Sequence, residues 1–288
     1  MPETNAYSLV DSGNGRKLER FGPYLLSRPC SQAVWKPQLP NSEWNQADAI
    51  FSREPTSSWR QRERLPDHWC LETADLTFKI APTDFGHLGL FPEQRPFWDW
   101  IRQRLLANPA SHPAPRVLNL FAYSGGATLA AASAGASVCH LDASKGMVTW
   151  ARENAALNQL ERAPIRWIVE DVKKFLKRER QRNSRYEGII LDPPSFGRGA
   201  KGEVFKIEEE IVPLLDDCRQ LLSDHPLFLL FSCHTPGFSP LVMHHLLQQA
   251  LEGVDGTLEK GEMALTDPTT PHIFAVPSGA YASWEATL

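Results

Sequence analysis

The stretch GIILDPPSF, residues 188–196, ends an apolar run with an acid, two prolines and an aromatic residue. Two consecutive prolines remove two backbone N–H donors and cannot continue inside a central sheet, so we expect a strand to stop there. In a functional interpretation, Asp192 and Pro193 would present a carboxylate and a carbonyl to a flat polar ligand, and Pro194 and Phe196 would form an apolar shelf beside them. A stiff strand exit without a ligand is the structural alternative.

The elements that would position these residues begin at Arg116, where short apolar runs alternate with helical patterns. We predict parallel strands in the runs RVLNLF, SVCHLD, IRWIVE, GIILD and PLFLLFS. The segments TLEKGEMAL and YASWEATL are expected to form a closing pair of strands. Repeated strand–helix units predict a doubly wound, Rossmann-like α/β sheet with helices on both faces.

The first 90 residues have a different texture, rich in Pro, Trp and short apolar runs without a helical period. They predict short strands and loops, such as a small antiparallel sheet. The segment FPEQRPFWDWIRQRLL then predicts a helix, because Pro96 suits its first turn. We therefore expect a β-rich region over 1–90, serving the substrate or forming a lid, and an α/β domain over 91–288.

Ligands of such sheets bind beyond the carboxyl ends of the strands. Gly125 and Gly126 follow the first predicted strand, Asp142 ends the second and Asp171 follows the third. Asp142 is suited to ribose hydroxyls and Asp171 to an adenine amine, with Val172 against the ring. Since the G-x-G-x-x-G fingerprint of dinucleotide readers is missing, this set favours S-adenosylmethionine over NAD. Taken one at a time, these residues have a structural alternative: the glycines can serve a turn, and the acids can cap helices.

The motifs NLFAYSGG, LDASKGMVTWARENAALN, DPPSF and FSC together resemble the class I S-adenosylmethionine-dependent methyltransferases, specifically the bacterial large-subunit ribosomal RNA cytosine-5 group. The resemblance covers about residues 94–288. It implies a cofactor site of Gln94, Phe121, Tyr123, Ser124, Gly125, Gly126, Asp142 and Asp171, with Val172, Asp192 and Pro193 beside it. It also implies an RNA substrate. The RNA-binding domain that well-known members carry at the N-terminus is not recognisable in residues 1–90.

The resemblance makes Cys233 and Asp192 the catalytic candidates. Methylating carbon 5 of cytosine requires a thiolate to add to carbon 6, and Cys233 would supply it while Asp192 stabilises the adduct. A nitrogen methyltransferase needs no nucleophile and would use Asp192 and Pro193 to orient an amine. In that case Cys233 is an inert buried residue. Ser195 stands where many cytosine-5 enzymes have a second cysteine, which argues against a two-cysteine mechanism.

The loop GRGAKGEVF follows Phe196 and carries Arg198 and Lys201, which suit either a substrate clamp or an exposed connector. Seven basic side chains between Lys173 and Arg185 face one acid, so this segment is either a solvated helix face or a phosphate-attracting patch. Either role would be local, because the net charge is −4.

Five widely spaced cysteines without a C-x-x-C pair argue against a disulfide framework and a zinc site, and a signal-like start is missing. We therefore expect a cytoplasmic enzyme acting on RNA. A non-catalytic nucleic-acid-binding module is the alternative of a different class, and a dehydrogenase is the weakest one.

Overall fold

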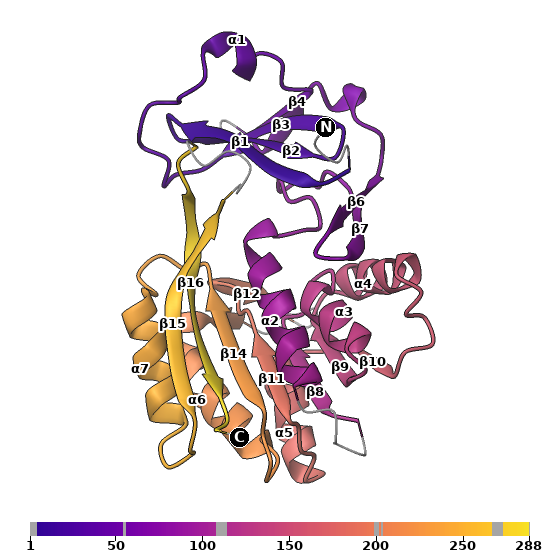
Figure 1. Ribbon diagram of the computed structural model, residues 1–288, viewed down its shortest axis with the longest axis vertical. Helices are drawn as coiled ribbons and strands as arrows, with labels where there is room; N and C mark the ends of the chain where they lie inside the picture. The colour runs from indigo at the N-terminus through magenta and orange to yellow at the C-terminus, as the bar shows by residue number, and fades with distance from the viewer. Residues whose placement is uncertain are drawn as a thin grey trace. The chain divides into compact units, whose positions relative to one another are not determined.

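The computed structural model describes residues 5–53, 56–107, 114–198, 202, 204–266 and 273–287. The chain divides into two compact units, coloured by residue number in Figure 1. The first unit holds Met1–Arg95 and Ala264–Ser278, and the second holds Pro96–Met263 and Gly279–Leu288. The first unit is therefore assembled from both ends of the chain.

The second unit is built on a seven-stranded sheet in the order β10-β9-β8-β11-β14-β16-β15. Its members are β8 (Arg116–Leu120), β9 (Ser137–Asp142), β10 (Ile165–Val169), β11 (Gly188–Leu191), β14 (Phe228–Cys233), β15 (Thr257–Leu265) and β16 (Val276–Glu285). The first five run parallel, and β16 pairs antiparallel to β14. The strand order reverses between β8 and β11, which is where a doubly wound sheet opens a binding crevice.

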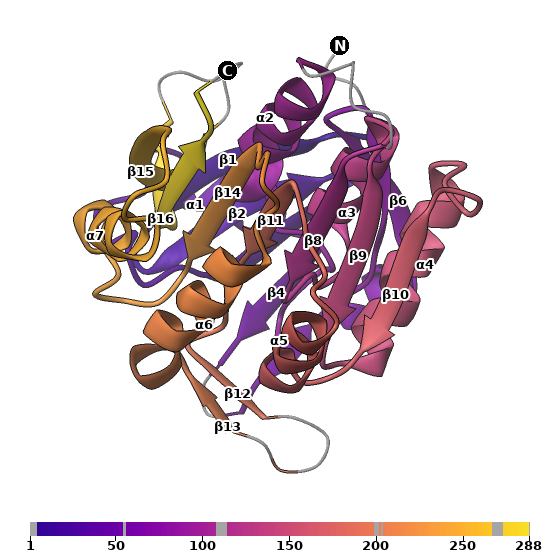
Figure 2. The ribbon, with the colours of Figure 1, turned by 90° about the horizontal axis from the view of Figure 1, so that it is seen from below.

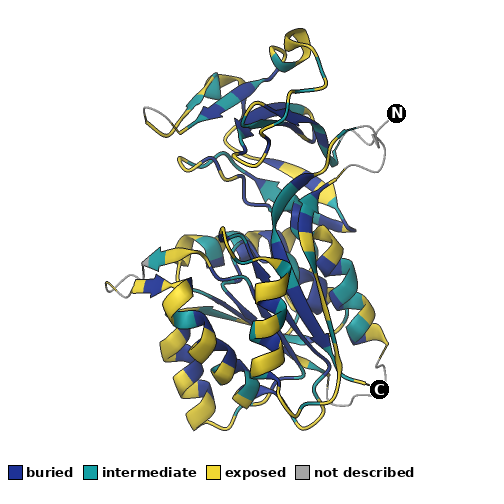
Figure 3. Ribbon diagram, turned by 90° about the vertical axis from the view of Figure 1, so that its left-hand side faces the viewer, coloured by how far each residue is buried: buried dark blue, intermediate teal, exposed yellow. Residues whose placement is uncertain are grey.

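Alternate residues of the central strands point to opposite faces, and each face has its own helices (Figure 2). Val117 and Ile190 pack with α2 (Arg95–Leu106) and α3 (Gly126–Ser133). Leu118 and Ile189 pack on the other face. The helices there are α5 (Val172–Gln181), α6 (Ile207–Leu221) and α7 (Pro240–Ala250), while α4 (Lys145–Leu157) contacts β9 and β10. Figure 3 shows the strands buried between helices whose outer faces are exposed.

The first unit contains a five-stranded sheet in the order β1-β2-β3-β4-β5 and a separate hairpin of β6 and β7. Its elements are β1 (Tyr7–Gly13), β2 (Arg16–Phe21), β3 (Tyr24–Pro29), α1 (Asn41–Trp44), β4 (Ala49–Ser52), β5 (Ser58–Arg60), η1 (Arg62–Arg64), β6 (Trp69–Thr73), β7 (Leu76–Ile80) and η2 (Pro92–Gln94). One core cluster joins Leu9 and Ala33 to Leu265 and Val276, so the returning segment completes this unit.

The α/β class, the β-rich N-terminal region and the closing strand pair are confirmed. Two details differ from the sequence predictions. The pair β3–β4 is parallel, in the region where a small antiparallel sheet was the example given. The segment expected to be a loop after Phe196 contains a small hairpin instead, β12 (Phe196–Arg198) with β13 (Val204–Lys206). No helix among the described residues is long and apolar enough to cross a membrane.

Candidate functional site

The loop after β8, Phe121–Gly126, is held in a constrained conformation; we name it the glycine loop. Phe121 and Tyr123 have φ values of 55° and 50°, and Gly125 has a φ of 94°. Left-handed backbone at non-glycine residues persists only where the surroundings enforce it, and such residues cluster at functional sites. A Cβ added at Gly126 would lie 2.5 Å from the Trp98 ring, so Gly126 is required by packing against α2.

Asp142, the last residue of β9, fastens this loop to the neighbouring strand. Its Oδ2 accepts the Tyr123 N–H at 2.9 Å, and its Oδ1 accepts the Ser144 N–H at 2.8 Å. Burial raises the pKa of Asp142, while these two backbone hydrogen bonds lower it. A carboxylate has about four acceptor positions, so Asp142 keeps capacity for ligand hydroxyls beyond the two backbone donors.

Buried polar side chains that sequence reasoning missed support the glycine loop. Asn154 of α4 is fully buried, and its Nδ2 donates to the Ser124 carbonyl at 2.9 Å. Beneath the loop, Thr128 Oγ1 lies 2.9 Å from both Asn119 Nδ2 and His140 Nδ1. Burial, followed by the charge of Arg152, lowers the pKa of His140 to about 3, so the imidazole is neutral at pH 7. The sequence signal that could have indicated this network is the presence of polar residues such as Asn119 and His140 within apolar strand runs.

Three other predicted cofactor residues have structural roles of their own. Asp171 caps α5, because its Oδ1 accepts the Lys174 N–H at 3.1 Å. Val172 is 5% exposed and packs in the core, which leaves little of its surface for an adenine ring. Gln94 ends η2 and belongs to the first unit. Binding of the cofactor by these three residues stays a prediction.

Polar contacts join the Asp-Pro-Pro turn, residues 192–194, and the following Ser195 to residues at and just after the end of the adjacent strand β14. Ser232 Oγ donates to Asp192 Oδ1 at 2.9 Å, and His234 Nε2 lies 3.6 Å from Asp192 Oδ2. Ser195 Oγ and Thr235 Oγ1 lie 2.7 Å apart. The Asp192 carboxylate is therefore held at the exit of β11, at the point predicted from the two prolines.

Past Asp192, the side chains differ in exposure. Pro193 is buried, whereas Pro194 is exposed and Phe196 is 50% exposed. Pro194 and Phe196 are thus both exposed, and their use as an apolar shelf for a base stays a prediction.

Cys233 lies at the end of β14, as expected, but its side chain is buried. It is the last residue of β14, pairs with Ala280 and has an exposure of 0%. Its Sγ accepts the Thr235 N–H at 3.3 Å. Burial raises the pKa of the Cys233 thiol, although the contacts with Thr235 oppose the shift. A reactive cysteine normally has a lowered pKa and partial exposure, so this environment is typical of an inert thiol.

The β12–β13 hairpin contacts the glycine loop through a residue that the sequence did not single out. The rings of Phe121 and Phe205 have centroids 5.1 Å apart, and Phe205 is 6% exposed. The hairpin includes the backbone of Arg198, whereas Lys201 lies outside the described residues. The segment that begins at the apolar shelf thus returns to pack against the loop after β8.

The donor set around the glycine loop fits S-adenosylmethionine. Helix α3 begins after Gly125 without a side-chain cap, so its first N–H groups are available to an anionic group such as a carboxylate. Asp142 offers acceptors for ribose hydroxyls on the neighbouring strand. The Asp-Pro-Pro turn stands on the other side of β8, next to this set, because β11 pairs with β8.

Known proteins share this fold. A SAM-dependent methyltransferase from Agrobacterium tumefaciens aligns in structure with a TM-score of 0.92 at 39% identity, covering 98% of this chain and 90% of that one. SMU.776, solved in complex with SAH, has the same fold with a TM-score of 0.74 at 18% identity, over 98% of this chain and 76% of that one. Among curated relatives, the ribosomal RNA large subunit methyltransferase K/L of Hahella chejuensis is 33% identical over 187 residues, 64% of this chain. The alignment spans 24% of that relative's length.

The profile of the family described as S-adenosylmethionine-dependent methyltransferase matches residues 48–233, which is more than half of the chain. That range includes the glycine loop, Asp142, the Asp-Pro-Pro turn and Cys233. The chain therefore belongs to the S-adenosylmethionine-dependent methyltransferase family and is an enzyme with S-adenosylmethionine as its cofactor.

Proposed function

We propose that this chain methylates a base of RNA, and that the RNA is ribosomal. The observation that carries the proposal is the Asp-Pro-Pro turn on β11 beside the glycine loop on β8, with the exposed ring of Phe196 next to it. A base taken out of its stack can lie on Pro194 and Phe196 while Asp192 meets its polar edge. The likeness to ribosomal RNA large subunit methyltransferases supports RNA as the substrate class.

The acceptor atom that the geometry supports best is a nitrogen. Bound S-adenosylmethionine supplies an electrophilic methyl group on a sulfonium, and a nucleophile aligned with it needs no covalent help. The carboxylate of Asp192, held by Ser232, accepts the hydrogens of an amine and orients its lone pair. His234, beside the same carboxylate, is suited to receive the proton that the amine releases.

Methylation of cytosine carbon 5 is the second candidate, favoured by the position of Cys233 at the end of β14, next to the strand that carries Asp192. It requires a thiolate that reaches carbon 6 of the base. The full burial of Cys233 and the raised pKa of its thiol support the nitrogen candidate instead.

Methyl transfer to RNA from cells lacking this protein, followed by mass analysis of the nucleosides, tests the proposal. Nitrogen transfer predicts N-methylated nucleosides and full activity of Cys233→Ala. Carbon transfer predicts 5-methylcytidine, loss of activity in Cys233→Ala and a stable covalent complex with RNA containing 5-fluorocytosine. If ribosomal RNA gains no methyl group under conditions where the cofactor binds, the proposed substrate is wrong.

A further inference from the structure

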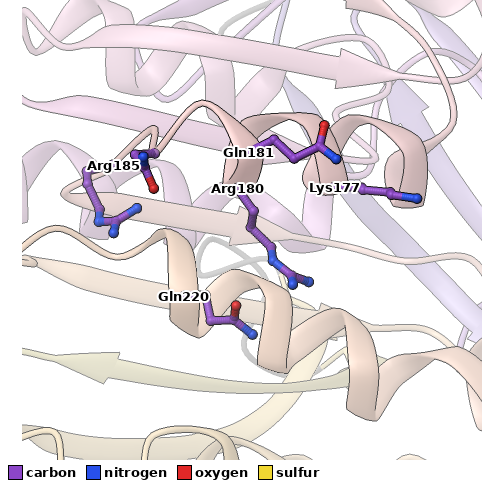
Figure 4. A pocket seen from close by; sticks show the side chains of 6 residues that line it. Lys177, Arg180, Gln181, Arg185 and Gln220 are labelled. Atoms are coloured by element: carbon purple, nitrogen blue, oxygen red, sulfur yellow. The ribbon is translucent and has the colours of Figure 1, made fainter.

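A polar pocket lies at the end of the second unit opposite the glycine loop. It has a volume of about 470 Å³, and Figure 4 shows the side chains that line it. They are Lys177, Arg180, Gln181, Asn183, Arg185 and Gln220. Because α5 starts at the carboxyl end of β10 and Arg185 precedes β11, these residues gather where the parallel strands begin.

The ion pairs of α5 show which of its basic side chains are neutralised by carboxylates within the protein and which are available to a ligand. Four of the seven basic side chains between Lys173 and Arg185 contact carboxylates: Lys173 with Glu210, Arg178 with Glu170, Arg180 with Asp217 and Arg182 with Glu179. Within the described part of the chain, neither Lys177 nor Arg185 has a carboxylate in ion-pair contact. Both of these line the pocket.

The lining as a whole matches one kind of ligand. Among the described residues, three cations and three side-chain amides line the pocket, without a carboxylate or an apolar side chain, and one of the cations, Arg180, is paired with Asp217. Cationic side chains bind phosphates, and amides donate to phosphate and sugar oxygens without reading sequence. With a net charge of −4, the protein as a whole gives no general reason to attract polyanions, so the attraction has to come from a local cluster of cations.

We propose that this pocket, which we name the basic pocket, binds the phosphodiester backbone of the RNA at a distance from the methylated base. The inference rests on the proposed function. Helix α5 has 10 residues and is therefore about 15 Å long. At roughly 3.4 Å per nucleotide, four to five stacked nucleotides span that length. An RNA segment of that length can run along α5, from the end of the helix that follows β10 to the end that lines the basic pocket.

The test measures RNA affinity at several salt concentrations for the wild type and for Lys177→Gln/Arg185→Gln. Each lost contact to single-stranded RNA should reduce the slope of log affinity against log salt by about 0.7. The double variant should also raise KM for RNA severalfold and leave kcat unchanged, since the base site is intact. The matched control is Lys173→Gln/Arg178→Gln, which loses the same charge from α5 outside the basic pocket and should keep the wild-type slope.

Three results would overturn the inference. If the wild type binds and methylates RNA but the pocket variant has an unchanged salt slope, the basic pocket does not bind the RNA backbone. The proposed function is then unaffected. An equal loss in the control shows a diffuse charge effect. If a free mononucleotide competes with RNA for the basic pocket and binds it as tightly, the ligand of the pocket is a nucleotide and not the RNA backbone. A wild type that neither binds nor methylates RNA fails at the proposed function instead.

Discussion

Asn154 and Ser124 are 30 positions apart, yet the Asn154 amide donates to the Ser124 carbonyl inside the protein. This bond ties helix α4 to the middle of the glycine loop. Removing the donor leaves a buried carbonyl unsatisfied, at a cost of about 1–3 kcal/mol. We expect Asn154→Ala to lower the free energy of unfolding by that amount and to weaken cofactor binding, measured by urea unfolding and titration calorimetry. Lys145→Ala, an exposed change on the same helix, should alter neither; equal cofactor affinity in Asn154→Ala would contradict the positioning role.

Asp142 and Asp171 follow neighbouring strands, and their variants should behave differently. Asp142→Ala should weaken cofactor binding by about 1–3 kcal/mol, because backbone donors and ligand hydroxyls lose their acceptor. Asp171→Ala removes the cap of α5 and should cost about 1 kcal/mol of stability. Calorimetric titration and thermal unfolding of both variants separate the two effects. Loss of cofactor affinity in Asp171→Ala beyond its stability cost would support the adenine contact predicted from the sequence.

The ring contact between Phe121 and Phe205 predicts a coupling between the hairpin and cofactor binding. Replacing a buried phenylalanine by alanine costs about 3–5 kcal/mol. Phe205→Ala should therefore destabilise the second unit and weaken cofactor affinity, while Phe205→Leu keeps most of the bulk and most of the affinity. Titration at a temperature where each variant remains folded gives the comparison. If Phe205→Ala binds the cofactor like the wild type, the hairpin does not support the glycine loop.

In the first unit, the fully buried Glu19 predicts a dependence of stability on pH. Burial by itself would raise the pKa of Glu19, but Arg28 and Lys17 outweigh it and lower the pKa below the ordinary 4.5. The unfolded chain therefore takes up a proton before the folded one does. The stabilisation is complete above the ordinary pKa and is lost as pH falls through the lowered value. For this reason, the free energy of unfolding of the wild type, measured with urea, should decrease below about pH 5.

Glu19→Gln is the control for that dependence. It leaves the buried Arg28 without its charged partner, so about 3–5 kcal/mol should be lost at pH 7. Its stability should then change less with acid than that of the wild type. Parallel curves for the two proteins would show that other carboxylates govern the acid response.

The sequence was most informative where local chemistry decides the structure. The prolines after Asp192 end β11 where expected, and the apolar runs became the parallel strands because both of their faces are buried. The hairpin after Phe196 was missed because GRGAKGEVF has no alternating pattern. Burial of Cys233 depends on the pairing with β16, a contact between distant segments that no local pattern reports.

Site residues divide in the same way. Asp142 follows from its place at the end of a strand, which the sequence shows directly. Asn154 acts from the middle of α4, and it becomes visible only when that helix is packed against the loop. The charge of α5 was visible as a run of basic residues, but the ion pairs that neutralise four of them come from other elements.

The return of Ala264–Ser278 to the first unit has a topological consequence. The polypeptide passes between the two units three times, and after hydrolysis of the peptide bond at Arg95 the N-terminal segment would still be held by noncovalent packing against Leu265 and Val276. Deleting the N-terminal segment would remove the partners of Leu265 and Val276 and expose these two apolar side chains. The second unit is thus not an independent module. Any exchange of the N-terminal region between proteins must also exchange the segment Ala264–Ser278.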